Sequence, residues 1–417
     1  MSFETATLDS LCELVVDCPH STPKWTDEGI IVLRNQNIKN GVLDLSAPSF
    51  TNEEDYQKRI KRAAPKAGDI VFTREAPMGE VCMIPEGLKC CLGQRQVLLR
   101  PKSDVNGQYL FWALQSPYVQ QQIAWNEGTG STVSNVRIPV LKALNIPRIG
   151  NEDMVAKSLS DIASKMALNT QTNQTLEQMA QAIFKSWFVD FDPVKAKMNG
   201  ELPEGMDAAT ASLFPEKLVE SELGLIPDGW ELTNIGKVSE CFDKKRIPLS
   251  KRQREQKQGS IPYYGATSVM DYVDEAIFDD IYLLIGEDGS VMKDDGTPFI
   301  QYIWGPAWVN NHAHVLQGIK PVSTEQLMLF FQQTNINAYV TGAVQLKINQ
   351  RNMNSIPFIK ASKEINERFY DVVAPLYAKI RAIKEENEQL AKLRDTLLPK
   401  LLSGEIELDV EKVNTND

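Results

Sequence analysis

Two pairs of side chains have the types and the spacing to do chemistry. Glu287 and Asp288 are adjacent in the segment GEDGS, and general acid–base catalysis needs such carboxylates in a pocket that holds substrate. An acidic turn between two strands explains this segment more simply, because glycine flanks it on both sides. His312 and His314 lie two residues apart, which predicts that both face one side of a strand. A histidine pair could bind a metal, but no third ligand with suitable spacing is evident, so we expect no metal site.

The cysteines and the missing motifs argue against several classes of enzyme. The chain has six cysteines and no CxxC pair, so we expect reduced and mostly buried thiols. No G-x-x-x-x-G-K-[ST] loop occurs, which argues against nucleotide hydrolysis and translocation. The Asn-Pro-Pro-aromatic and Asp-Pro-Pro-Tyr tetrapeptides of adenine-N6 methyltransferases are also missing. The sequence therefore predicts a chain that is not an enzyme and that binds no S-adenosylmethionine itself.

Charge is unevenly distributed in this chain, whose formal net charge is −11. Residues 1–150 have a net charge of zero and residues 226–360 have a net charge of −2, so most of the net negative charge lies in the other segments. Basic runs occupy 58–66 and 244–257, and a basic loop on a neutral domain can contact phosphates. The overall acidity predicts modest DNA affinity for the isolated chain, with a basic partner supplying the rest.

The sequence repeats itself at a nearly constant offset. The segment LNIPRI around Pro147 returns as NSIPFI around Pro357. Thr-Gly pairs at 129–130 and 341–342 precede these segments, and a long helical pattern follows each of them. Such an offset indicates a duplicated unit, each a globular domain followed by a long helix. Two similar units joined by rigid helices suggest a protein that reads two separated sites on one pseudo-symmetric ligand, most commonly duplex DNA.

Two segments carry an apolar seam that alternates by steps of four and three residues, the pattern of a coiled-coil helix. Pro193 is expected to end the first helix. The first seam contains Val155, Leu159, Ile162, Met166, Asn169, Asn173, Leu176, Ala180, Ile183 and Trp187. The second contains Phe369, Val372, Leu376, Ile380, Ile383, Asn387, Leu390, Leu393, Leu397 and Leu401.

Asn173 and Asn387 are equivalent in the repeat, and each lies near the middle of its seam. A polar pair in an apolar seam costs stability but fixes the register of the helices, so we expect the two amides to meet. The alternative is that both amides face solvent at the edge of the seam.

Shorter patterns predict the elements of the globular segments. GDIVFTREAPMGEVCMIPEG indicates two short strands around a turn, and CCLGQRQVLLRP indicates a further strand. GQYLFWALQSPYVQQQIAWN indicates one amphipathic helix. The expected fold is α+β, with two duplicated mixed α/β domains and two long antiparallel coiled-coil helices related by a pseudo-two-fold axis. The expected boundaries are a first domain at 1–150, a first helix at 151–192, a linker at 193–225, a second domain at 226–360, a second helix at 361–404 and a tail at 405–417.

The chain shows no targeting or membrane segment. It begins MSFETATLDS, which has acids and no apolar core of a signal peptide. No apolar run approaches the ~20 residues that span a bilayer. We therefore expect a cytoplasmic protein with no membrane partner.

Several segments match a known family. The match is strongest in LEQMAQAIFKSWFVDFDPVKAKMNG and FPEKLVESELGLIPDGWE, within residues 176–231. It continues in DCPHSTPKW, GIIVLRNQNIKNG, GDIVFTREAPMGEV, PYYGATS, LLIGEDGSV and NNHAHVLQG, and so spans nearly the whole chain. In these segments the chain resembles the specificity subunits of type I restriction-modification systems.

The resemblance implies two target-recognition domains, each reading one half of a split sequence in double-stranded DNA. It also implies an antiparallel helical spacer that sets the distance between the two halves. In that family two methyltransferase subunits dock on the specificity subunit, and restriction subunits can join the complex. We therefore expect no cofactor in this chain, with S-adenosylmethionine, ATP and Mg²⁺ on partner subunits.

A DNA-recognition subunit needs lysine and arginine to hold phosphates, and planar amides, guanidinium groups or histidines to read base edges. In the first domain, Gln94 and Gln96 bracket Arg95, which offers bidentate contacts to guanine or adenine. The predicted DNA-binding set here is His20, Thr22, Lys24, Arg34, Asn35, Lys58, Arg59, Lys61, Arg62, Arg74, Gln94, Arg95, Gln96 and Asn135.

In the second domain, VNNHAHVLQG aligns with LGQRQVLLRP, so His312 and His314 take the places of Gln94 and Gln96. The acidic turn at Glu287 could accept hydrogen bonds from cytosine amino groups. The predicted set here is Lys244, Lys245, Arg246, Lys251, Arg252, Tyr263, Tyr264, Ser268, Asn310, Asn311, His312, His314 and Lys347.

A second class of function fits the same patterns. The chain could be an interaction scaffold whose apolar seams bind partner proteins and whose globular ends bind something other than DNA. The acidity favours this alternative, whereas the resemblance favours non-catalytic recognition of a bipartite, asymmetric DNA target.

Overall fold

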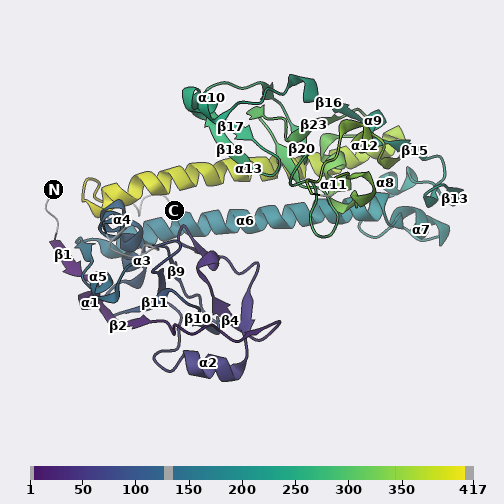
Figure 1. Cartoon of the computed structure of the whole chain (residues 1–417). Helices are drawn as coiled ribbons and strands as arrows, with labels where there is room; N and C mark the ends of the chain where they lie inside the picture. The colour runs from purple at the N-terminus through teal and green to yellow at the C-terminus, as the bar shows by residue number, and fades with distance from the viewer. Residues whose placement is uncertain (1–3, 126–134, 343, 409–417) are drawn as a thin grey trace. The chain divides into compact units, whose positions relative to one another are not determined.

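The computed structural model describes residues 4–125, 135–342 and 344–408, so the repeated Thr129-Gly130 lies outside the described residues. The chain divides into two compact units. Unit 1 comprises Met1–Asn169 and Glu385–Asp417, and unit 2 comprises Thr170–Lys384. Two long helices cross the division, so each unit contains a globular domain and a segment of both helices (Figure 1).

Unit 1 is built on a four-stranded antiparallel sheet with the order β2–β11–β8–β9. Alternate residues of its strands point to opposite faces. Phe72 and Leu99 face a buried cluster shared with the helix α3, whereas Val71 and Leu98 face a second buried cluster. The strands are β2 (Cys12–Asp17), β8 (Ile70–Thr73), β9 (Val81–Met83) and β11 (Gln96–Pro101), and the helix is α3 (Gly107–Gln115).

A second four-stranded sheet of unit 1 has the order β10–β4–β7–β3, and its strands β10 and β4 are parallel. Its strands are β3 (Trp25–Thr26), β4 (Ile30–Leu33), β7 (Ser49–Thr51) and β10 (Cys90–Leu92). The remaining elements are β1 (Glu4–Thr7) paired with β12 (Asn145–Arg148), β5 (Ile38–Lys39) paired with β6 (Val42–Leu43), and the helices α1 (Leu8–Leu11), α2 (Glu53–Arg59), α4 (Pro117–Ala124) and α5 (Ile138–Lys142).

Unit 2 repeats this plan. A four-stranded antiparallel sheet has the order β16–β23–β20–β21, and a second sheet, β18–β17–β22–β19, contains the parallel pair β17 and β22. The strands are β16 (Ser239–Cys241), β17 (Gln258–Tyr264), β18 (Val269–Val273), β19 (Phe278–Asp279), β20 (Tyr282–Gly286), β21 (Ile300–Ile303), β22 (Pro306–Val309) and β23 (Ala313–Gly318).

The repeated NIPR and IPFI segments have equivalent places. NIPR forms β12, and PFI of the second segment lies in β24; each is the second strand of a two-stranded antiparallel ladder in its unit, so the predicted duplication is confirmed. The remaining elements of unit 2 are the ladder β15 (Glu231–Asn234) with β24 (Pro357–Lys360), the hairpin β13 (Leu218–Ser221) with β14 (Gly224–Pro227), and the helices α7 (Asp192–Met198), α8 (Ala208–Ser212), α9 (Ile235–Val238), α10 (Lys251–Gln256), α11 (Thr324–Gln333) and α12 (Gln350–Asn354).

The two predicted long helices are α6 (Glu152–Phe188) and α13 (Lys363–Leu402). All ten seam residues of α6 are buried or half-buried. The α13 seam agrees with the prediction except at Leu393, which is 46% exposed. Among the residues that the structure describes, no helix is both long and apolar enough to cross a membrane.

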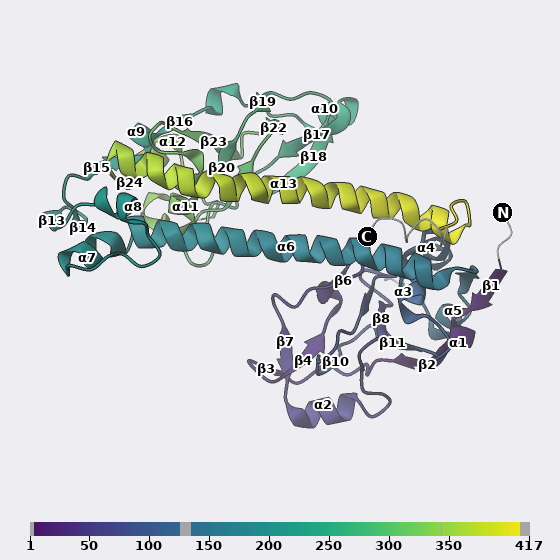
Figure 2. The ribbon, with the colours of Figure 1, turned by 180° about the vertical axis from the view of Figure 1, so that it is seen from behind.

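Contacts inside each unit show that the two helices are antiparallel (Figure 2). In unit 1, the Asn169 amide donates to Asn387 Oδ1 at 2.8 Å, while Leu159 and Leu401 belong to one buried cluster. Going along α6 from Leu159 to Asn169, the neighbouring α13 residue changes from Leu401 to Asn387, so the two helices run in opposite directions. The Asn387 amide also donates to the Met166 carbonyl at 3.2 Å, so a polar layer interrupts the seam here.

In unit 2, the Asn173 amide donates to the Ile380 carbonyl at 3.4 Å, and the rings of Phe184 and Phe369 lie 6.0 Å apart. Phe369 is fully buried, and its ring also meets that of Phe188 edge to face at 4.9 Å. This aromatic cluster joins α6 to α13, because edge-to-face rings add stabilisation beyond the burial of their area. The direct pairing of Asn173 with Asn387 stays a prediction.

Two local predictions differ from the structure, and both concern a proline. The expected single helix after Gly107 is two helices, because Ser116 caps α4 and Pro117 occupies its first turn. The α6 helix ends at Phe188, before Pro193 is reached, and Pro193 instead lies in the first turn of α7. A proline fits the first helical turn because the amide that it lacks has no partner there. The two strands expected around PMG are β8 and β9, which pair antiparallel.

Candidate nucleic-acid interface

Unit 1 has a surface hollow of about 340 Å³ that gathers four of the predicted residues, Arg34, Asn35, Gln94 and Arg95. Arg34 and Asn35 follow β4, whereas Gln94 and Arg95 lie between β10 and β11. Because β4 and β10 are parallel neighbours, their carboxyl ends meet at one edge of the sheet. The topology thus brings together two polar segments that are far apart in the sequence.

Two contacts hold the outer side of this hollow. The Arg34 guanidinium lies 5.4 Å from the centre of the Trp25 ring, a cation–π contact, and Trp25 is 47% exposed. The Gln94 amide donates to the carbonyl of His20 at 2.6 Å, which ties the 94–95 turn to the loop that precedes β3. The arrangement presents a flat guanidinium, an exposed indole and amide groups on one surface.

Arg95 is the most unusual residue of the hollow. Its φ is +67°, in the left-handed region that costs a side chain with a Cβ about 1–3 kcal/mol. Its Nε lies 3.3 Å from Glu75 Oε2, and the Asn35 amide donates to the Glu75 carbonyl. The Arg95 side chain is 55% exposed. A strained backbone that holds an exposed, half-neutralised guanidinium is typical of a binding site.

Arg74 lies beneath this surface and is buried. Its Nη1 is 2.8 Å from both carboxylate oxygens of Asp17, and its Nε donates to the Val136 carbonyl at 3.0 Å. Its Nη2 donates to Asn135 Oδ1 at 3.2 Å, and the Asn135 amide donates to Glu75 Oε1 at 2.6 Å. Arg74 and Asn135 were predicted to contact DNA, but Arg74 is committed to protein groups and supports the hollow from within.

The basic run after β7 divides into exposed and buried members. Lys58, Lys61 and Arg62 are exposed. Arg59 is 5% exposed, and its guanidinium donates to the carbonyls of Leu92 at 3.0 Å and Gly93 at 3.2 Å. Arg59 therefore does not reach a phosphate, which corrects the expectation for this residue.

Gln96 is also buried, with no exposed surface, and its Oε1 accepts from the Gly93 amide at 3.2 Å. It does not share a surface with Gln94, because β11 begins at Gln96 and carries this side chain into the sheet. Of the other predicted residues, His20, Thr22 and Lys24 are exposed.

The same topology gathers the predicted residues of unit 2. Strands β17 and β22 are parallel, so Tyr264 and Asn310 lie together at their carboxyl ends. The backbone N–H of Asn310 donates to the Tyr264 carbonyl at 3.1 Å. Asn311 and His312 follow and are exposed. Asn310 itself is 3% exposed, and its Oδ1 accepts from the His312 amide at 2.7 Å, so it shapes the loop and does not face solvent.

The acidic turn after β20 holds cations and does not form a catalytic carboxylate pair. Glu287 Oε2 accepts from Arg246 Nη1 at 2.8 Å, and Glu287 Oε1 lies 3.3 Å from Lys347 Nζ. Asp288 Oδ1 lies 2.5 Å from His312 Nδ1. Both carboxylates thus contact side chains that were predicted to bind DNA: Glu287 contacts Arg246 and Lys347, and Asp288 contacts His312.

His314 is fully buried, at 1% exposure, whereas His312 is exposed. The prediction that both histidines share one face is wrong, because β23 begins at Ala313 and leaves His312 in the preceding turn. His314 Nδ1 lies 2.6 Å from Asp243 Oδ2, and its Nε2 lies 2.9 Å from the Ile348 carbonyl. His314 is therefore not available to a base edge.

Asp243, Cys241 and His314 form the one group, among the described residues, whose donor atoms are close enough to hold a metal ion, within 4.8 Å of one another. Both histidine nitrogens and the carboxylate already have protein partners, and Arg246 Nη2 lies 3.2 Å from Asp243 Oδ2. Burial raises the pKa of the Cys241 thiol to about 12, so it is not a thiolate at neutral pH. The donor set fits an ion-pair network, not a metal site.

The remaining predicted residues of unit 2 differ in exposure. Tyr263 is 1% exposed, and its hydroxyl accepts from the Leu249 amide at 2.9 Å, so it is a core residue and not a contact for DNA. Arg246 is half-buried, with its guanidinium committed to Glu287 and Asp243. The exposed members are Lys244, Lys245, Lys251, Arg252, Ser268 and Lys347.

Comparison with known proteins decides the family. Residues 2–178 and 227–392 match the type I restriction modification DNA specificity domain. These two matches cover well over half of the chain and fall on its two repeats. The chain belongs to the type I restriction-modification specificity family. It is a non-catalytic DNA specificity subunit.

Relatives of this specificity subunit match over most of their length. It is 27% identical to the type I restriction enzyme HindI specificity subunit of Haemophilus influenzae, over 86% of this chain and 90% of that one. It is 23% identical to the MjaIX specificity subunit of Methanocaldococcus jannaschii, over 84% and 79%. Its fold is similar to that of the S subunit of a type I restriction-modification system from M. genitalium, with a TM-score of 0.55, 17% identity and 96% of each chain covered.

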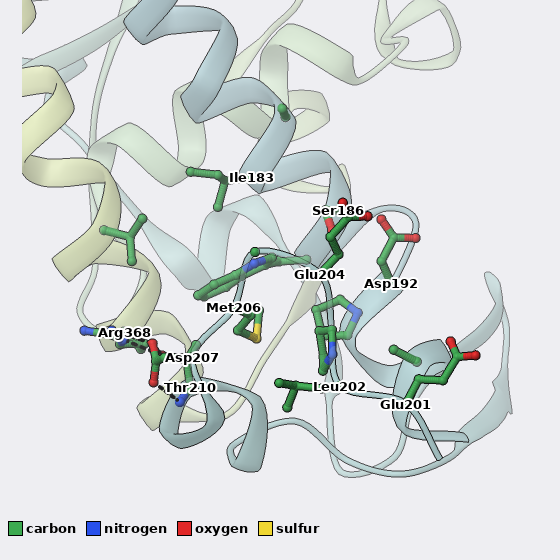
Figure 3. A pocket seen from close by; sticks show the side chains of 17 residues that line it. Ile183, Ser186, Asp192, Glu201, Leu202, Glu204, Met206, Asp207, Thr210 and Arg368 are labelled. Carbon is green, nitrogen blue, oxygen red and sulfur yellow. Dashed lines mark hydrogen bonds and ion pairs between the residues drawn. The ribbon is translucent and has the colours of Figure 1, made fainter. Parts of the chain in front are cut away.

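The specificity subunit has a second candidate site in unit 2, a pocket of about 640 Å³ between the end of α6, the linker and α13 (Figure 3). Leu202 and Met206 lie near its centre, and Ile183 comes from α6. On one side Asp207 accepts hydrogen bonds from the Thr210 hydroxyl at 2.7 Å and from Arg368 at 3.1 Å. The hydrogen bonds from Thr210, followed by Arg368, lower the pKa of Asp207 to about 2.

The other acidic side chains of the pocket are Asp192, Glu201 and Glu204. Glu201 and Glu204 are exposed, and no ion pair to their carboxylates forms within the described ranges 4–125, 135–342 and 344–408. The apolar floor and the unpaired acidic rim suit a partner segment that is both apolar and basic.

Several residues that build the candidate surfaces were not predicted. Trp25, Glu75, Asp17 and Asp243 have no local signal beyond polarity or an aromatic ring, and each acts through a residue at least nine positions away. One weak signal was present. Asp17 directly ends a β-strand pattern, where a carboxylate at the strand end can reach a cation on the neighbouring strand.

Proposed function

We propose that this specificity subunit reads a bipartite, asymmetric sequence in double-stranded DNA, one half with each unit. The observation that carries the proposal is the repeated topology: in both units a parallel strand pair brings exposed polar residues together at its carboxyl edge. In unit 1 these are Arg34, Gln94 and Arg95, and in unit 2 they are Asn311 and His312. Guanidinium, amide and imidazole groups are the side chains that read base edges in the major groove.

The two surfaces differ in chemistry, so the two half-sites should differ in sequence. Unit 1 presents arginine and glutamine, whereas unit 2 presents histidine, asparagine and Lys347. The exposed lysines and arginines of the runs 58–66 and 244–257 supply phosphate contacts. We assign the recognition domains to residues 1–150 and 226–360, close to the two family matches.

Methylation mapping tests this proposal. Deleting the gene for this subunit should abolish adenine methylation at one motif that has two different specific halves separated by a non-specific spacer. Single-molecule sequencing of genomic DNA from the deletion strain and from a complemented strain provides the measurement. Persistence of every methylated motif in the deletion strain, or loss of a motif without a spacer, would contradict the bipartite assignment.

We further propose that the pocket of Figure 3 docks a methyltransferase subunit. The linker at 193–225 contains six acidic and three basic residues, so a basic partner is electrostatically complementary to it. Apolar side chains such as Ile183, Leu202 and Met206 give such a segment an anchor inside the pocket. The acidic linker then strengthens the complex and also keeps this surface away from DNA phosphates.

Charge reversal tests the docking surface. Glu201→Lys with Glu204→Lys should weaken methyltransferase binding about tenfold, because two attractive contacts become repulsive. Titration calorimetry with the purified partner gives the affinity. A matched control is Glu220→Lys with Glu222→Lys, which makes the same charge change at exposed positions of the same linker outside the pocket. Equal weakening by both double variants would show a general effect of charge and overturn the pocket assignment.

A further inference from the structure

Residues of the two units can be matched to one another by the register of their paired strands. In unit 1, Leu98 of β11 lies opposite Val16 and Val71. In unit 2, Leu316 of β23 lies opposite Cys241 and Leu283. Leu98 and Leu316 are thus equivalent, so Gln96 and His314, two residues earlier on each strand, are equivalent as well.

A second equivalence involves the segment before the short helix that follows each recognition surface. The five-residue helices α5 and α12 begin at Ile138 and Gln350. Val136 and Ile348 each lie two residues before the helix, and both are fully buried. Their carbonyl groups therefore occupy the same place in the two units.

Both carbonyls accept a hydrogen bond from a buried cationic side chain, but the side chain differs. The Val136 carbonyl accepts from Arg74 Nε at 3.0 Å, and Arg74 also pairs with Asp17 at 2.8 Å. The Ile348 carbonyl lies 2.9 Å from His314 Nε2, while His314 Nδ1 lies 2.6 Å from Asp243. Each unit thus has a clamp made of a cation, a carboxylate and a carbonyl, with a guanidinium in unit 1 and an imidazole in unit 2.

The partners of His314 define its protonation. Burial tends to raise the pKa of Asp243, but the hydrogen bond and charge of His314, the Val315 amide and Arg246 outweigh it, so this pKa is lowered and the carboxylate is ionised. A carboxylate and a carbonyl only accept hydrogen bonds. Both nitrogens of His314 must therefore carry a proton, which makes the ring a buried imidazolium.

The clamp of unit 2 connects three segments that carry surface residues. Arg246 Nη2 lies 3.2 Å from Asp243, and its Nη1 donates to Glu287 at 2.8 Å. The Ile348 amide donates to the Glu287 carbonyl at 2.9 Å, which places Lys347 Nζ 3.3 Å from the Glu287 carboxylate. The charged or titratable groups that face His314 are thus Asp243, Glu287 and Arg246, with Lys347 bound to Glu287 and the Cys241 thiol within 4.8 Å.

We propose that His314 is a positioning residue for the second half-site, whose imidazolium clamps Asp243 to the Ile348 carbonyl and holds the loop that carries Lys347. The inference rests on the proposed reading of DNA by both units. The clamp holds the Ile348 segment through both ring nitrogens, one at Asp243 and one at the Ile348 carbonyl. Recognition of the second half-site therefore depends on His314, whereas recognition of the first depends on Arg74.

The test measures discrimination at each half-site with the intact complex of this subunit and its methyltransferase partner. A DNA library varies one half of the target at a time, and the ratio of methylation on intact and altered targets is measured for the parent complex and for each variant. This ratio cancels differences in the rate of methyl transfer itself. We expect His314→Gln to lower discrimination at the second half-site about fivefold or more, the scale of one lost hydrogen bond, with no change at the first.

Variants make the assignment specific. Arg74→Lys is the matched change in unit 1 and should affect only the first half-site. Asp243→Asn with His314→Gln leaves no unpaired charge, so it should fold even where His314→Gln alone does not, and its discrimination at the second half-site should stay low. Circular dichroism melts report folding for each variant.

The outcomes separate this inference from the proposed function. Full discrimination at the second half-site in a folded His314 variant, or an equal loss at both half-sites, would overturn the role of His314 while leaving the reading of DNA intact. Absence of discrimination at both half-sites in the parent complex would instead overturn the proposed function.

Discussion

Adding one heptad to each long helix should lengthen the spacer of the methylated sequence by about three base pairs. Seven helical residues extend a helix by about 10 Å, and base pairs of B-DNA are stacked about 3.4 Å apart. The insertions belong at opposed positions, between Asn169 and Asn173 in α6 and between Ile380 and Asn387 in α13. A seven-residue insertion keeps the seam in phase, because the apolar pattern repeats every seven residues.

Methylation of the original target should fall at least about a hundredfold in this variant. The second recognition surface then lies about 10 Å, or about three base pairs, beyond the second half-site of the original target when the first half-site is bound. Sequencing of methylated DNA reveals the new motif and its spacer. The control inserts the heptad into α6 alone, which mismatches the two helices and should reduce methylation at every spacing. An unchanged spacer in the double insertion would refute the idea that the helices set the distance.

The elements that the sequence predicts well are those with a repeating or local signal. The alternating four- and three-residue steps of α6 identify a continuous helix, and its seam residues are buried or half-buried as expected. The strands around PMG are recognisable because Val and Ile runs end at turn residues. The split between α3 and α4 also had a local signal, since Ser116 followed by Pro117 is a capped helix start.

The burial of polar residues had no such signal. Arg59 and Lys58 are adjacent and chemically similar, yet Arg59 is buried because it donates to carbonyls more than thirty residues away. His314 and His312 likewise separate into a buried and an exposed residue, according to where β23 begins. The residue type, read from the sequence, shows only that a polar side chain is able to bind a base or a phosphate. Only the long-range pairing of strands decides whether it faces solvent or serves as a support beneath the surface.

Arg95→Ala should relax recognition at one position of one half-site and leave the other half-site unchanged. Arg95 is exposed in the unit 1 hollow, and Glu75 neutralises only one side of its guanidinium, so its outer edge can form a bidentate pair with a guanine. Loss of such a pair costs about 1–3 kcal/mol, which corresponds to roughly 5- to 150-fold less discrimination at that base. Arg95 also adopts a positive φ, which costs alanine as much as arginine, so the substitution removes the side chain without relieving the backbone.

The measurement compares methylation rates on targets that carry each base at every position of both half-sites. The control is Lys157→Ala, which removes one positive charge from an exposed position on α6 in the same unit. A phosphate contact would instead weaken methylation uniformly across all sequences and reduce its salt dependence, because phosphates carry no sequence information. Loss of discrimination at both half-sites would contradict separate reading by the two units. A change confined to one base of one half-site would assign the unit 1 hollow, and Arg95 within it, to direct readout.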